Sequence, residues 1–346
     1  MLSADLDHIL DHTRQLWDEA RGGRIFVTGG TGFIGCWLLE SFAWANERLG
    51  LGAEMLVLTR SFAVFQKKAP HLANRADIRF QHGDVRDFKF PPGSFSHVIH
   101  AATEASGKLN DETPALMLET IVAGTRRALE FSVQCGAKKF LLTSSGAVYG
   151  RQPSDLIRVG EDYAGGPDVS NPQSAYGEGK RISELLCAIY SRQQGLEAKI
   201  ARCFAFVGPY LPWDAHFAIG NFIRDAVAGG PIVVKGDGTP YRSYLYAADL
   251  AIWLWRILLQ GVNNRPYNVG SRNQFTIAEV AAAVSRALPG NVPVSIAQKP
   301  IPGQAPQRYV PETGRAEREL GLREWVGLED AIRRTARWRQ ATPGFS

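Results

Sequence analysis

Tyr176 and Lys180 are the two side chains in this sequence best suited to proton transfer. In the stretch "SAYGEGK" they stand four residues apart at the start of a helical pattern, a spacing that puts both on one helix face. Because an ammonium group favours the phenolate, we expect Lys180 to lower the pKa of Tyr176 from about 10 toward neutral pH. The phenol could then exchange a proton with an oxygen of a bound molecule. Taken alone, the same pair is also typical of an exposed helix face.

A serine at the end of an apolar run supplies a second hydroxyl. The stretch "KKFLLTSSGAVYG" reads as a buried strand that leads into a turn, and Ser145 stands where the strand ends. We expect its hydroxyl to hydrogen-bond the same oxygen as Tyr176. The next two positions, Gly146 and Ala147, carry no acid, base or thiol. The residues alone leave open whether this small pair bears on the chemistry or only forms a turn.

The elements that must position these groups follow an alternating pattern. Short β-branched runs such as "RIFVTGG", "EMLVLTR" and "HVIHAAT" alternate with longer amphipathic segments, which predicts parallel strands covered by helices on both faces. We expect this doubly wound α/β sheet to span residues 23–205. Residues 206–346 are punctuated by Gly, Pro and Asn, which predicts a smaller, mixed α/β substrate lobe, with segments of the two parts interleaved.

An extra helix is expected before the first strand. Residues 1–22 place Leu6, Ile9, Leu10 and Trp17 at helical spacing, so we predict an N-terminal helical extension. Packing against the rest of the protein is its expected role. Docking of a partner is the alternative that the pattern leaves open.

A glycine-rich turn follows the first strand and opens the next helix. In "VTGGTGFIG" the glycines allow a tight turn, a close approach of backbone to a pyrophosphate, and close packing of helix on strand. The helix N-terminus would face the phosphates. We therefore predict a dinucleotide site here, contacted by Gly29, Thr31, Gly32, Phe33, Ile34 and Gly35.

The ends of the next strands carry the other expected cofactor contacts. The second strand ends in Thr59 and Arg60, without the carboxylate that would accept the adenosine ribose hydroxyls of NAD. A hydroxyl and a guanidinium would instead accommodate a 2′-phosphate, which modestly favours NADP(H) over NAD(H), although Lys67 or Lys68 could serve the same phosphate. The remaining predicted contacts are Asp84 and Val85 near the adenine, and Ala101, Ala102 and Thr103 near the nicotinamide.

Composition narrows the class of protein. Of the 346 residues, 45% are apolar, and the charged N-terminus has neither a signal peptide core nor a membrane span, so we expect a soluble, cytoplasmic protein that does not enter membranes. The net charge is +5, but the basic residues are spread along the chain, which argues against a nucleic-acid-binding surface. A mild positive excess of this kind also suits a small anionic ligand. Four widely spaced cysteines indicate buried free thiols, and we expect no metal.

Taken together and in order, these motifs resemble the extended short-chain dehydrogenase/reductase family, in its NAD(P)-dependent nucleotide-sugar epimerase/dehydratase branch. The resemblance runs from about Gly23 to about Trp338. It implies a Rossmann-type domain and a lobe that closes over a nucleoside-diphosphate sugar. The motifs that carry it are "TGGTGFIG", "GDVRD", "IVAGTRRALE", "LLTSSGAVYG", "PQSAYGEGK", "FVGPY", "GDGTPYRSYLYAADLA", "YNVGS" and "RYVPE".

The resemblance also assigns roles. Ser145, Tyr176 and Lys180 would be the catalytic set, and Tyr176 and Lys180 would contact the cofactor, with Lys180 holding the nicotinamide ribose. Diphosphate contacts would come from the lobe, and two converging arginines suit such a ligand. Relatives dimerise through the helices expected at "ALMLETIVAGTRRALEFSVQ" and "YGEGKRISELLCAIYSRQ", so a homodimer is expected. The implied substrate contacts are Asn221, Arg242 and Arg308.

The positions beside the catalytic serine separate the reactions of this branch. By resemblance, 4,6-dehydratases carry an acidic pair there, decarboxylases a glutamate at the second position, and C3/C5 epimerases a cysteine. With Gly146 and Ala147, this chain keeps only hydride transfer and the tyrosine proton. A 4-epimerase and a 4-ketoreductase are therefore the two expected activities. A 4,6-dehydratase is disfavoured by Gly146 and Ala147, and a non-catalytic NADP-binding regulator by the presence of Tyr176 and Lys180. Ile121 and Ala205 also depart from the asparagines of many relatives.

Overall fold

A seven-stranded parallel sheet forms the centre of the protein. The structure is a computed structural model that describes residues 2–103, 107–213 and 217–342. The strand order is β11-β6-β5-β4-β1-β2-β3, and every pairing is parallel. The strands are β1 (Arg24–Thr28), β2 (Glu54–Thr59), β3 (Ile78–His82), β4 (His97–His100), β5 (Lys139–Ser145), β6 (Glu197–Cys203) and β11 (Pro266–Val269).

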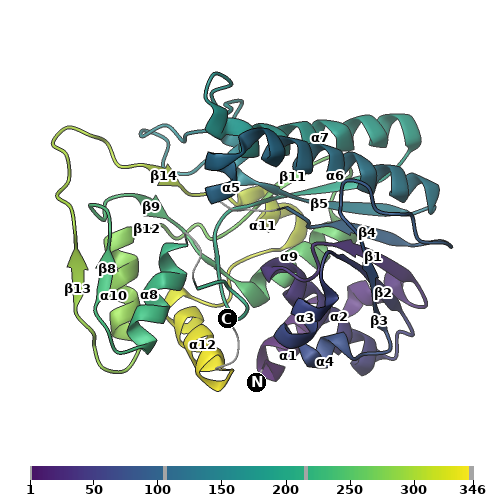
Figure 1. Cartoon of the computed structure of the whole chain (residues 1–346), viewed down its shortest axis with the longest axis horizontal. Helices are drawn as coiled ribbons and strands as arrows, with labels where there is room; N and C mark the ends of the chain where they lie inside the picture. The colour runs from purple at the N-terminus through teal and green to yellow at the C-terminus, as the bar shows by residue number, and fades with distance from the viewer. Residues whose placement is uncertain (1, 104–106, 214–216, 343–346) are drawn as a thin grey trace.

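Helices cover both faces of this sheet (Figure 1). Alternate residues of each strand point to opposite faces, so Phe26 and Phe140 pack beneath α6 (Pro114–Gln134) and α7 (Ala175–Gln194). Val27 and Leu141 belong to the other core, beneath α2 (Phe33–Leu49) and α9 (Ala247–Gln260). The doubly wound α/β fold expected from the alternating pattern is confirmed. The other helices of this part are η1 (Arg14–Ala20), α3 (Phe62–Lys68), α4 (Pro70–Ala73), α5 (Gly107–Glu112), η2 (Gly146–Tyr149), η3 (Pro172–Ser174) and α11 (Gly314–Leu320).

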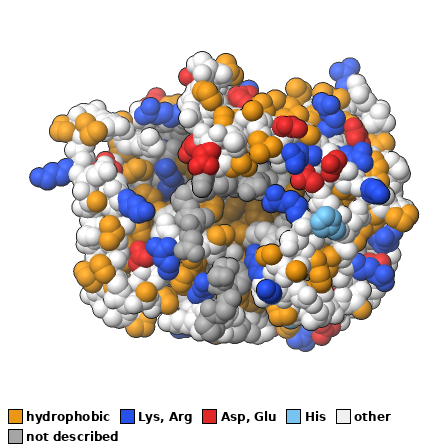
Figure 2. Space-filling model, in the orientation of Figure 1, with side chains coloured by type: hydrophobic (Ala, Val, Ile, Leu, Met, Phe, Trp, Pro, Cys, Tyr) orange, Lys and Arg blue, Asp and Glu red, His pale blue; other side chains and the backbone are white. Residues whose placement is uncertain are grey.

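A smaller lobe stands beyond the carboxyl ends of the strands, on the left of Figure 1. In it β8 pairs with β13, and β9 lies between β12 and β14. Figure 2 shows a hollow between this lobe and the sheet, with hydrophobic side chains in its floor and Lys or Arg side chains near its edge. The elements are β7 (Phe206–Val207), α8 (Ala218–Val227), β8 (Ile232–Val234), β9 (Tyr241–Arg242), β10 (Leu245–Tyr246), β12 (Phe275–Thr276), α10 (Ile277–Ala287), β13 (Val294–Ile296), β14 (Arg308–Tyr309) and α12 (Leu328–Ala341).

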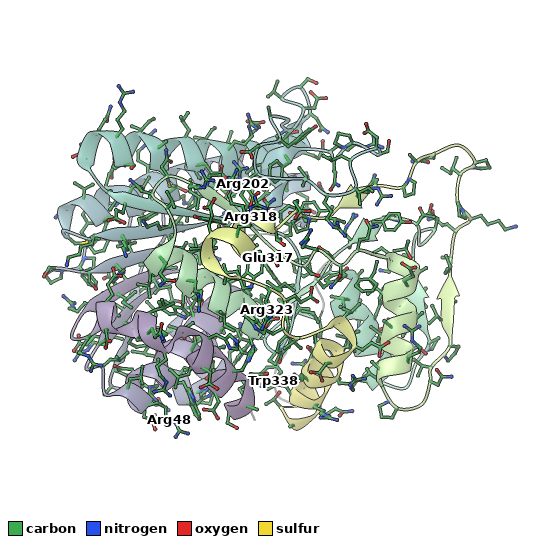
Figure 3. All side chains as sticks on the ribbon, turned by 180° about the vertical axis from the view of Figure 1, so that it is seen from behind. Arg48, Arg202, Glu317, Arg318, Arg323 and Trp338 are labelled. Carbon is green, nitrogen blue, oxygen red and sulfur yellow. The ribbon has the colours of Figure 1, made fainter. Side chains whose placement is uncertain are left out.

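The expected N-terminal helix is α1 (Ser3–Thr13), which packs on α9 and α2. Its buried Asp5 accepts hydrogen bonds from Tyr246 and from Arg334 of α12, so the extension ties the sheet to the lobe. Trp338, also on α12, points from the lobe toward the larger body (Figure 3), where its ring centre lies 4.8 Å from that of Tyr210. The boundaries at 22/23 and 205/206 stay a prediction, and β11 returns to the sheet from beyond the second one.

Three features of the described residues bear on the expected class of protein. All four cysteines are buried and free, as expected. Among the described helices, none has both the length and the apolar character needed to span a bilayer. In the same part of the chain, no three His, Cys, Asp or Glu side chains are grouped so that they could hold a metal ion.

Candidate active site

The glycine turn after β1 lies against the end of β4. Gly29 has φ +72°, and a Cβ on it would lie 2.4 Å from the carbonyl carbon of Ala101, so only glycine fits. The backbone N–H of Ala102 donates to the Thr28 hydroxyl (3.2 Å), which joins the two strand ends. Since α2 begins at Phe33, its N-terminus faces this cradle. These residues fit a dinucleotide, and the contacts predicted for each of them stay predictions.

Basic side chains gather at the end where the adenosine is expected. Arg86 binds the Asp84 carboxylate through Nε (2.9 Å) and Nη2 (3.2 Å), and this hydrogen bonding lowers the pKa of Asp84. The charge of the exposed Arg60 lowers it further, so that guanidinium also lies near the carboxylate. Thr59 is buried and accepts from the backbone N–H of Ser61 (3.2 Å). Lys68 donates to the Thr31 carbonyl (2.9 Å), directly on the glycine turn.

The three predicted catalytic residues come together where β5 meets α7. Ser145 is the last residue of β5, and its buried Oγ accepts a hydrogen bond from the Ala147 N–H (3.1 Å). Tyr176 lies in the first turn of α7, where its backbone N–H donates to Asn110 Oδ1 (3.2 Å). Lys180 follows one turn later and is only 2% exposed. Burial raises the pKa of Tyr176, and a side-chain hydrogen bond with Ser145 acts in the opposite direction, so the two hydroxyls lie next to each other.

Lys180 does not act on Tyr176 as the sequence led us to expect. Its Nζ donates to Thr103 Oγ1 (2.6 Å) and to the Thr143 carbonyl (2.7 Å), and it lies 6.0 Å from the Tyr176 ring centre. Burial lowers the pKa of Lys180 to about 8. Burial also raises the pKa of Tyr176, and only the Ser145 hydrogen bond works against this. The expected lowering by the lysine is therefore absent, because its hydrogen bonds go to β4 and β5.

A buried histidine, missed in the sequence, supports the floor of the site. His100 ends β4, and its Nδ1 and Nε2 lie 2.8 Å from Thr28 Oγ1 and 3.2 Å from Thr125 Oγ1. Burial, with a smaller effect of the Lys180 charge, lowers the pKa of His100 to about 3. The imidazole is thus neutral at physiological pH and links β1, β4 and α6. A histidine at a strand end was the only sequence signal.

The space beside Gly146 is filled by aromatic side chains. A Cβ on Gly146 would lie 2.7 Å from ring carbons of Phe204 and 2.8 Å from the phenol oxygen of Tyr309. Tyr309 Oη is also 3.5 Å from Ser145 Oγ. In "RYVPE" the sequence predicted a ligand contact for Arg308 and did not indicate a role for the neighbouring tyrosine. The Tyr309 phenol, which belongs to the lobe, therefore lies in the space that a side chain at position 146 would take.

The two arginines predicted to contact a diphosphate stand on the paired strands β9 and β14. In the register of β14 and β9, Arg308 is beside Tyr241 and Tyr309 is beside Arg242, so the two arginines lie on opposite faces of this small sheet. The Arg308 guanidinium lies 4.2 Å from the Tyr241 ring centre and donates to Gln274 Oε1 (2.9 Å). Arg242 shares the face of Tyr309. The convergence of the two arginines on a diphosphate stays a prediction.

The remaining predicted positions lie as follows. Asn221 is on α8, where its Oδ1 accepts a long hydrogen bond from Arg224 (3.5 Å). Val85 packs against Gly124 of α6, where a Cβ would come within 2.9 Å of it. Ile121, which departs from the family pattern, packs against Gly179 of α7. Their roles toward a ligand stay predictions.

Known proteins resemble the chain over nearly its full length. The sequence profile of the NAD dependent epimerase/dehydratase family matches residues 25–270. UDP-glucuronic acid decarboxylase 6 of Arabidopsis thaliana is 31% identical over 310 residues, which are 89% of this chain and 86% of that protein. Two proteins of solved structure are each 27% identical to this chain. One is DesIV, a dTDP-glucose 4,6-dehydratase from Streptomyces venezuelae, with a TM-score of 0.77 over 93% of this chain and 98% of that chain. The other is the Thermus thermophilus UDP-glucose 4-epimerase in complex with NAD, with a TM-score of 0.74 over 92% of this chain and 99% of that chain. The profile covers well over half of the sequence, so the chain is an enzyme that belongs to the NAD-dependent epimerase/dehydratase family.

Proposed function

We propose that this enzyme transfers a hydride at one carbon, C4, of a nucleoside-diphosphate sugar, as a 4-epimerase or a 4-ketoreductase. The observation that carries the proposal is the meeting of Ser145, Tyr176 and Lys180 at the end of β5, with no ionisable side chain at positions 146 and 147. Support for the substrate class comes from the relatives, whose names specify UDP-glucuronic acid, dTDP-glucose and UDP-glucose.

In this proposal each residue has one task. Tyr176 gives its proton to the sugar oxygen, or takes it back, and Ser145 hydrogen-bonds the same oxygen. Lys180 is held by Thr103 and Thr143 at the ends of β4 and β5, where it would hold the ribose of the cofactor. A bound nicotinamide would supply or accept the hydride. Neutral His100 keeps the floor of the site free of a second positive charge beside Lys180.

Dehydration and decarboxylation are disfavoured on chemical grounds. Both need a group beyond the tyrosine that can move a proton, and Gly146 and Ala147 have none. The adjacent space holds Phe204, which has no exchangeable proton, and Tyr309, whose pKa burial raises well above its ordinary value. A non-catalytic NADP-binding regulator is disfavoured because such a protein has no need of the buried Lys180.

For the cofactor we propose NADP(H) over NAD(H). Arg60 follows β2, which ends without a carboxylate, and it lies near the Asp84–Arg86 pair. A guanidinium there would bind a 2′-phosphate, whereas the carboxylate common in NAD sites would repel it.

We also propose a homodimer built on α6 and α7. These two helices pack along each other, and each keeps large apolar side chains exposed to solvent: Leu116 and Val133 on α6, Leu185 and Ile189 on α7. Burial of such a stripe is a common basis of symmetric association. Light scattering of the purified protein tests this, and a monomer at micromolar concentration would contradict it. A cytoplasmic location stays a prediction.

The direct test is a product assay. Purified enzyme is incubated with UDP-, dTDP-, CDP- and GDP-sugars and their 4-keto derivatives, with NAD(H) or NADP(H), and the sugars are followed by proton NMR. An epimerase forms the C4 epimer without net change in cofactor absorbance at about 340 nm, whereas a ketoreductase oxidises one reduced cofactor per sugar. Formation of a 4-keto-6-deoxy sugar or a pentose, or no turnover of any sugar, would overturn the proposal.

A further inference from the structure

Tyr309 brings a second phenol to the site from a distant part of the chain. Its ring packs against Phe204, with centroids 4.7 Å apart, and its Oη lies 3.5 Å from Ser145 Oγ. We propose that Tyr309 is a positioning residue: its phenol fixes the Ser145 hydroxyl so that the serine hydrogen points at the reacting sugar oxygen, and Gly146 is small because it must admit this phenol. The inference rests on the proposed function and adds a residue to its site.

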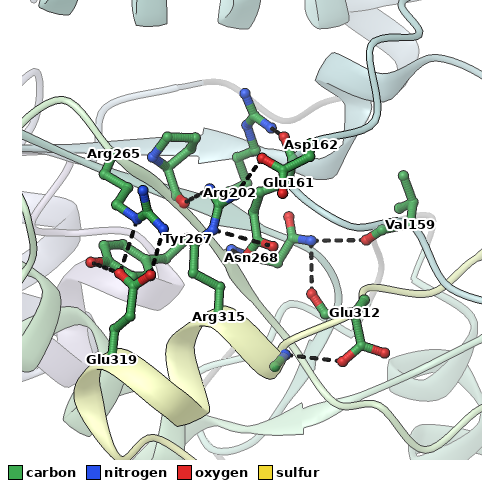
Figure 4. Close-up of polar contacts among 12 residues, drawn as sticks. Val159, Glu161, Asp162, Arg202, Arg265, Tyr267, Asn268, Glu312, Arg315 and Glu319 are labelled. Carbon is green, nitrogen blue, oxygen red and sulfur yellow. Dashed lines mark hydrogen bonds and ion pairs between the residues drawn. The ribbon is translucent and has the colours of Figure 1, made fainter.

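The backbone that carries Tyr309 is held firmly. The next residue, Val310, donates its N–H to the buried Gln152 Oε1 (3.0 Å), and its carbonyl accepts from the Val159 N–H (2.9 Å). Asn268 Nδ2 then binds the carbonyls of Val159 and Glu312, at 2.9 Å each (Figure 4). With β14 also paired to β9, the tyrosine is fixed from several elements. Its contact with Ser145 is therefore built into the fold.

A count of hydrogen bonds at Ser145 gives the role of the phenol. A serine hydroxyl has one hydrogen and two acceptor sites. The Ala147 N–H occupies one acceptor site (3.1 Å). Burial, with a contribution from nearby Tyr176, raises the pKa of Tyr309, while its hydrogen bond with Ser145 and the charge of Arg242 act in the opposite direction. The phenol therefore keeps its proton, and in this proposal it donates that proton into the second acceptor site of Ser145. The serine hydrogen is then left for Tyr176 or for the sugar oxygen.

The length of the contact fits a site that closes on its substrate. A separation of 3.5 Å is long for an O–H···O hydrogen bond, and catalytic contacts of this kind shorten when the substrate binds. Tyr309 belongs to the lobe, on β14, whereas Ser145 belongs to the sheet, on β5.

The test is a double-mutant cycle on the full-length enzyme, with the sugar that the product assay identifies. Tyr309→Phe keeps the ring against Phe204 and removes only the hydroxyl. We expect kcat to fall about 10- to 100-fold, with KM and cofactor affinity within about twofold of the wild type. Because Tyr309 acts through Ser145, adding Tyr309→Phe to Ser145→Ala should cost less than about threefold more.

The control is Tyr163→Phe, which removes a phenol oxygen from the same aromatic cluster and should leave kcat unchanged. Thermal unfolding checks that each variant is folded. An unchanged kcat in Tyr309→Phe, or losses that multiply in the double variant, would overturn the inference and leave the proposed function intact. A wild-type enzyme that turns over no nucleotide sugar would instead overturn the proposed function, and this inference with it.

Discussion

Two polar regions lie close together in the protein and use their side chains differently. Around Asn268, each polar group of the side chain has a hydrogen-bond partner. Its Nδ2 donates to two backbone carbonyls (Figure 4), and its Oδ1 accepts from the Tyr149 phenol at 2.7 Å. Arg202 binds Glu184 with Nε and Nη2, and Tyr149 with Nη1. At the candidate active site, by contrast, the Ser145 side chain contacts only one backbone N–H and two phenols, and in the proposed function its hydrogen turns to the sugar oxygen. We infer that the first region maintains the structure and the second performs the chemistry.

The difference explains why burial alone does not identify a catalytic group. Arg202 and Lys180 are both largely shielded from solvent and both charged. Arg202 has a carboxylate partner at 2.7 Å, so its charge is neutralised within the fold. The hydrogen bonds of Lys180 go to the neutral oxygens of Thr103 and Thr143, and burial lowers its pKa to about 8. An incompletely compensated buried group is the stronger indicator of function.

The sharpest test of this comparison removes one oxygen from the cavity. Tyr176→Phe should lower kcat about 1,000-fold, because the proton that the sugar oxygen exchanges is lost. Its free energy of unfolding should change by less than about 1 kcal/mol, because the variant keeps the ring and loses the hydrogen bond with Ser145. Tyr190→Phe, on the same helix, is the control and should leave kcat unchanged. Steady-state kinetics and urea unfolding measure the two effects, and equal activity of both variants would contradict the assignment.

The opposite outcome is expected in the region around Asn268. Asn268→Ala leaves two carbonyls and a phenol without their partner, so we expect a loss of about 3 kcal/mol in the free energy of unfolding. The exposed Asn263, which also makes hydrogen bonds through its side chain, is the matched control, and Asn263→Ala should cost less than about 1 kcal/mol. Both losses are measured by urea unfolding. Equal losses in the two variants would show that the buried hydrogen bonds of Asn268 contribute no more to stability than those of an exposed asparagine.

Much of the architecture could be predicted from the sequence because local signals specify it. Short β-branched runs that alternate with amphipathic segments predicted parallel strands covered by helices on both faces, but not the order of the strands in the sheet. The glycine motif predicted a tight turn between strand and helix, but not that Gly29 lies against the end of β4. The meeting of Ser145 with Tyr176 followed from motif order alone.

Other parts depend on contacts that no local pattern encodes. Tyr309 reaches Ser145 across 164 residues of sequence, through the packing of the lobe, so its part in the site could not be read from "RYVPE". The separation of Arg242 and Arg308 depends on the register of two-residue strands. The partners of Lys180 depend on how α7 lies over β4 and β5, which decides whether its ammonium reaches Tyr176 or Thr143.

A smaller effect is expected for stability at Lys180. The pKa of this lysine is about 8 in the folded protein and close to its ordinary 10.5 in the unfolded chain. Between these values the unfolded chain holds a proton that the folded protein has released, so stability rises with pH through this window, and the penalty is complete below pH 8. The free energy of unfolding of Lys180→Met at pH 7 should therefore be about 1 kcal/mol higher than that of the wild type, although the variant loses activity.

The advantage of Lys180→Met should shrink as the pH rises from 8 to 10.5, which urea unfolding at several pH values would reveal. Lys199 is a suitable control because it is equally buried but ion-paired with Glu197 at 2.6 Å, so Lys199→Met should not stabilise the protein. A Lys180→Met variant that is less stable than the wild type at pH 7 would mean that the bonds to Thr103 and Thr143 outweigh the burial of the charge.

The last prediction concerns two guanidinium groups at the adenosine end. Arg86 is engaged by Asp84, whereas Arg60 is exposed at the end of β2. We expect Arg60→Ala to weaken NADP(H) about 10-fold and to leave NAD(H) within about twofold, because only NADP(H) carries the 2′-phosphate. Arg79→Ala, an exposed arginine on β3, is the control. Fluorescence titration with each reduced cofactor measures the affinities, and the NADP(H) effect should decrease at high salt, because an exposed charge pair is screened. Equal weakening of both cofactors would place Arg60 outside the phosphate site.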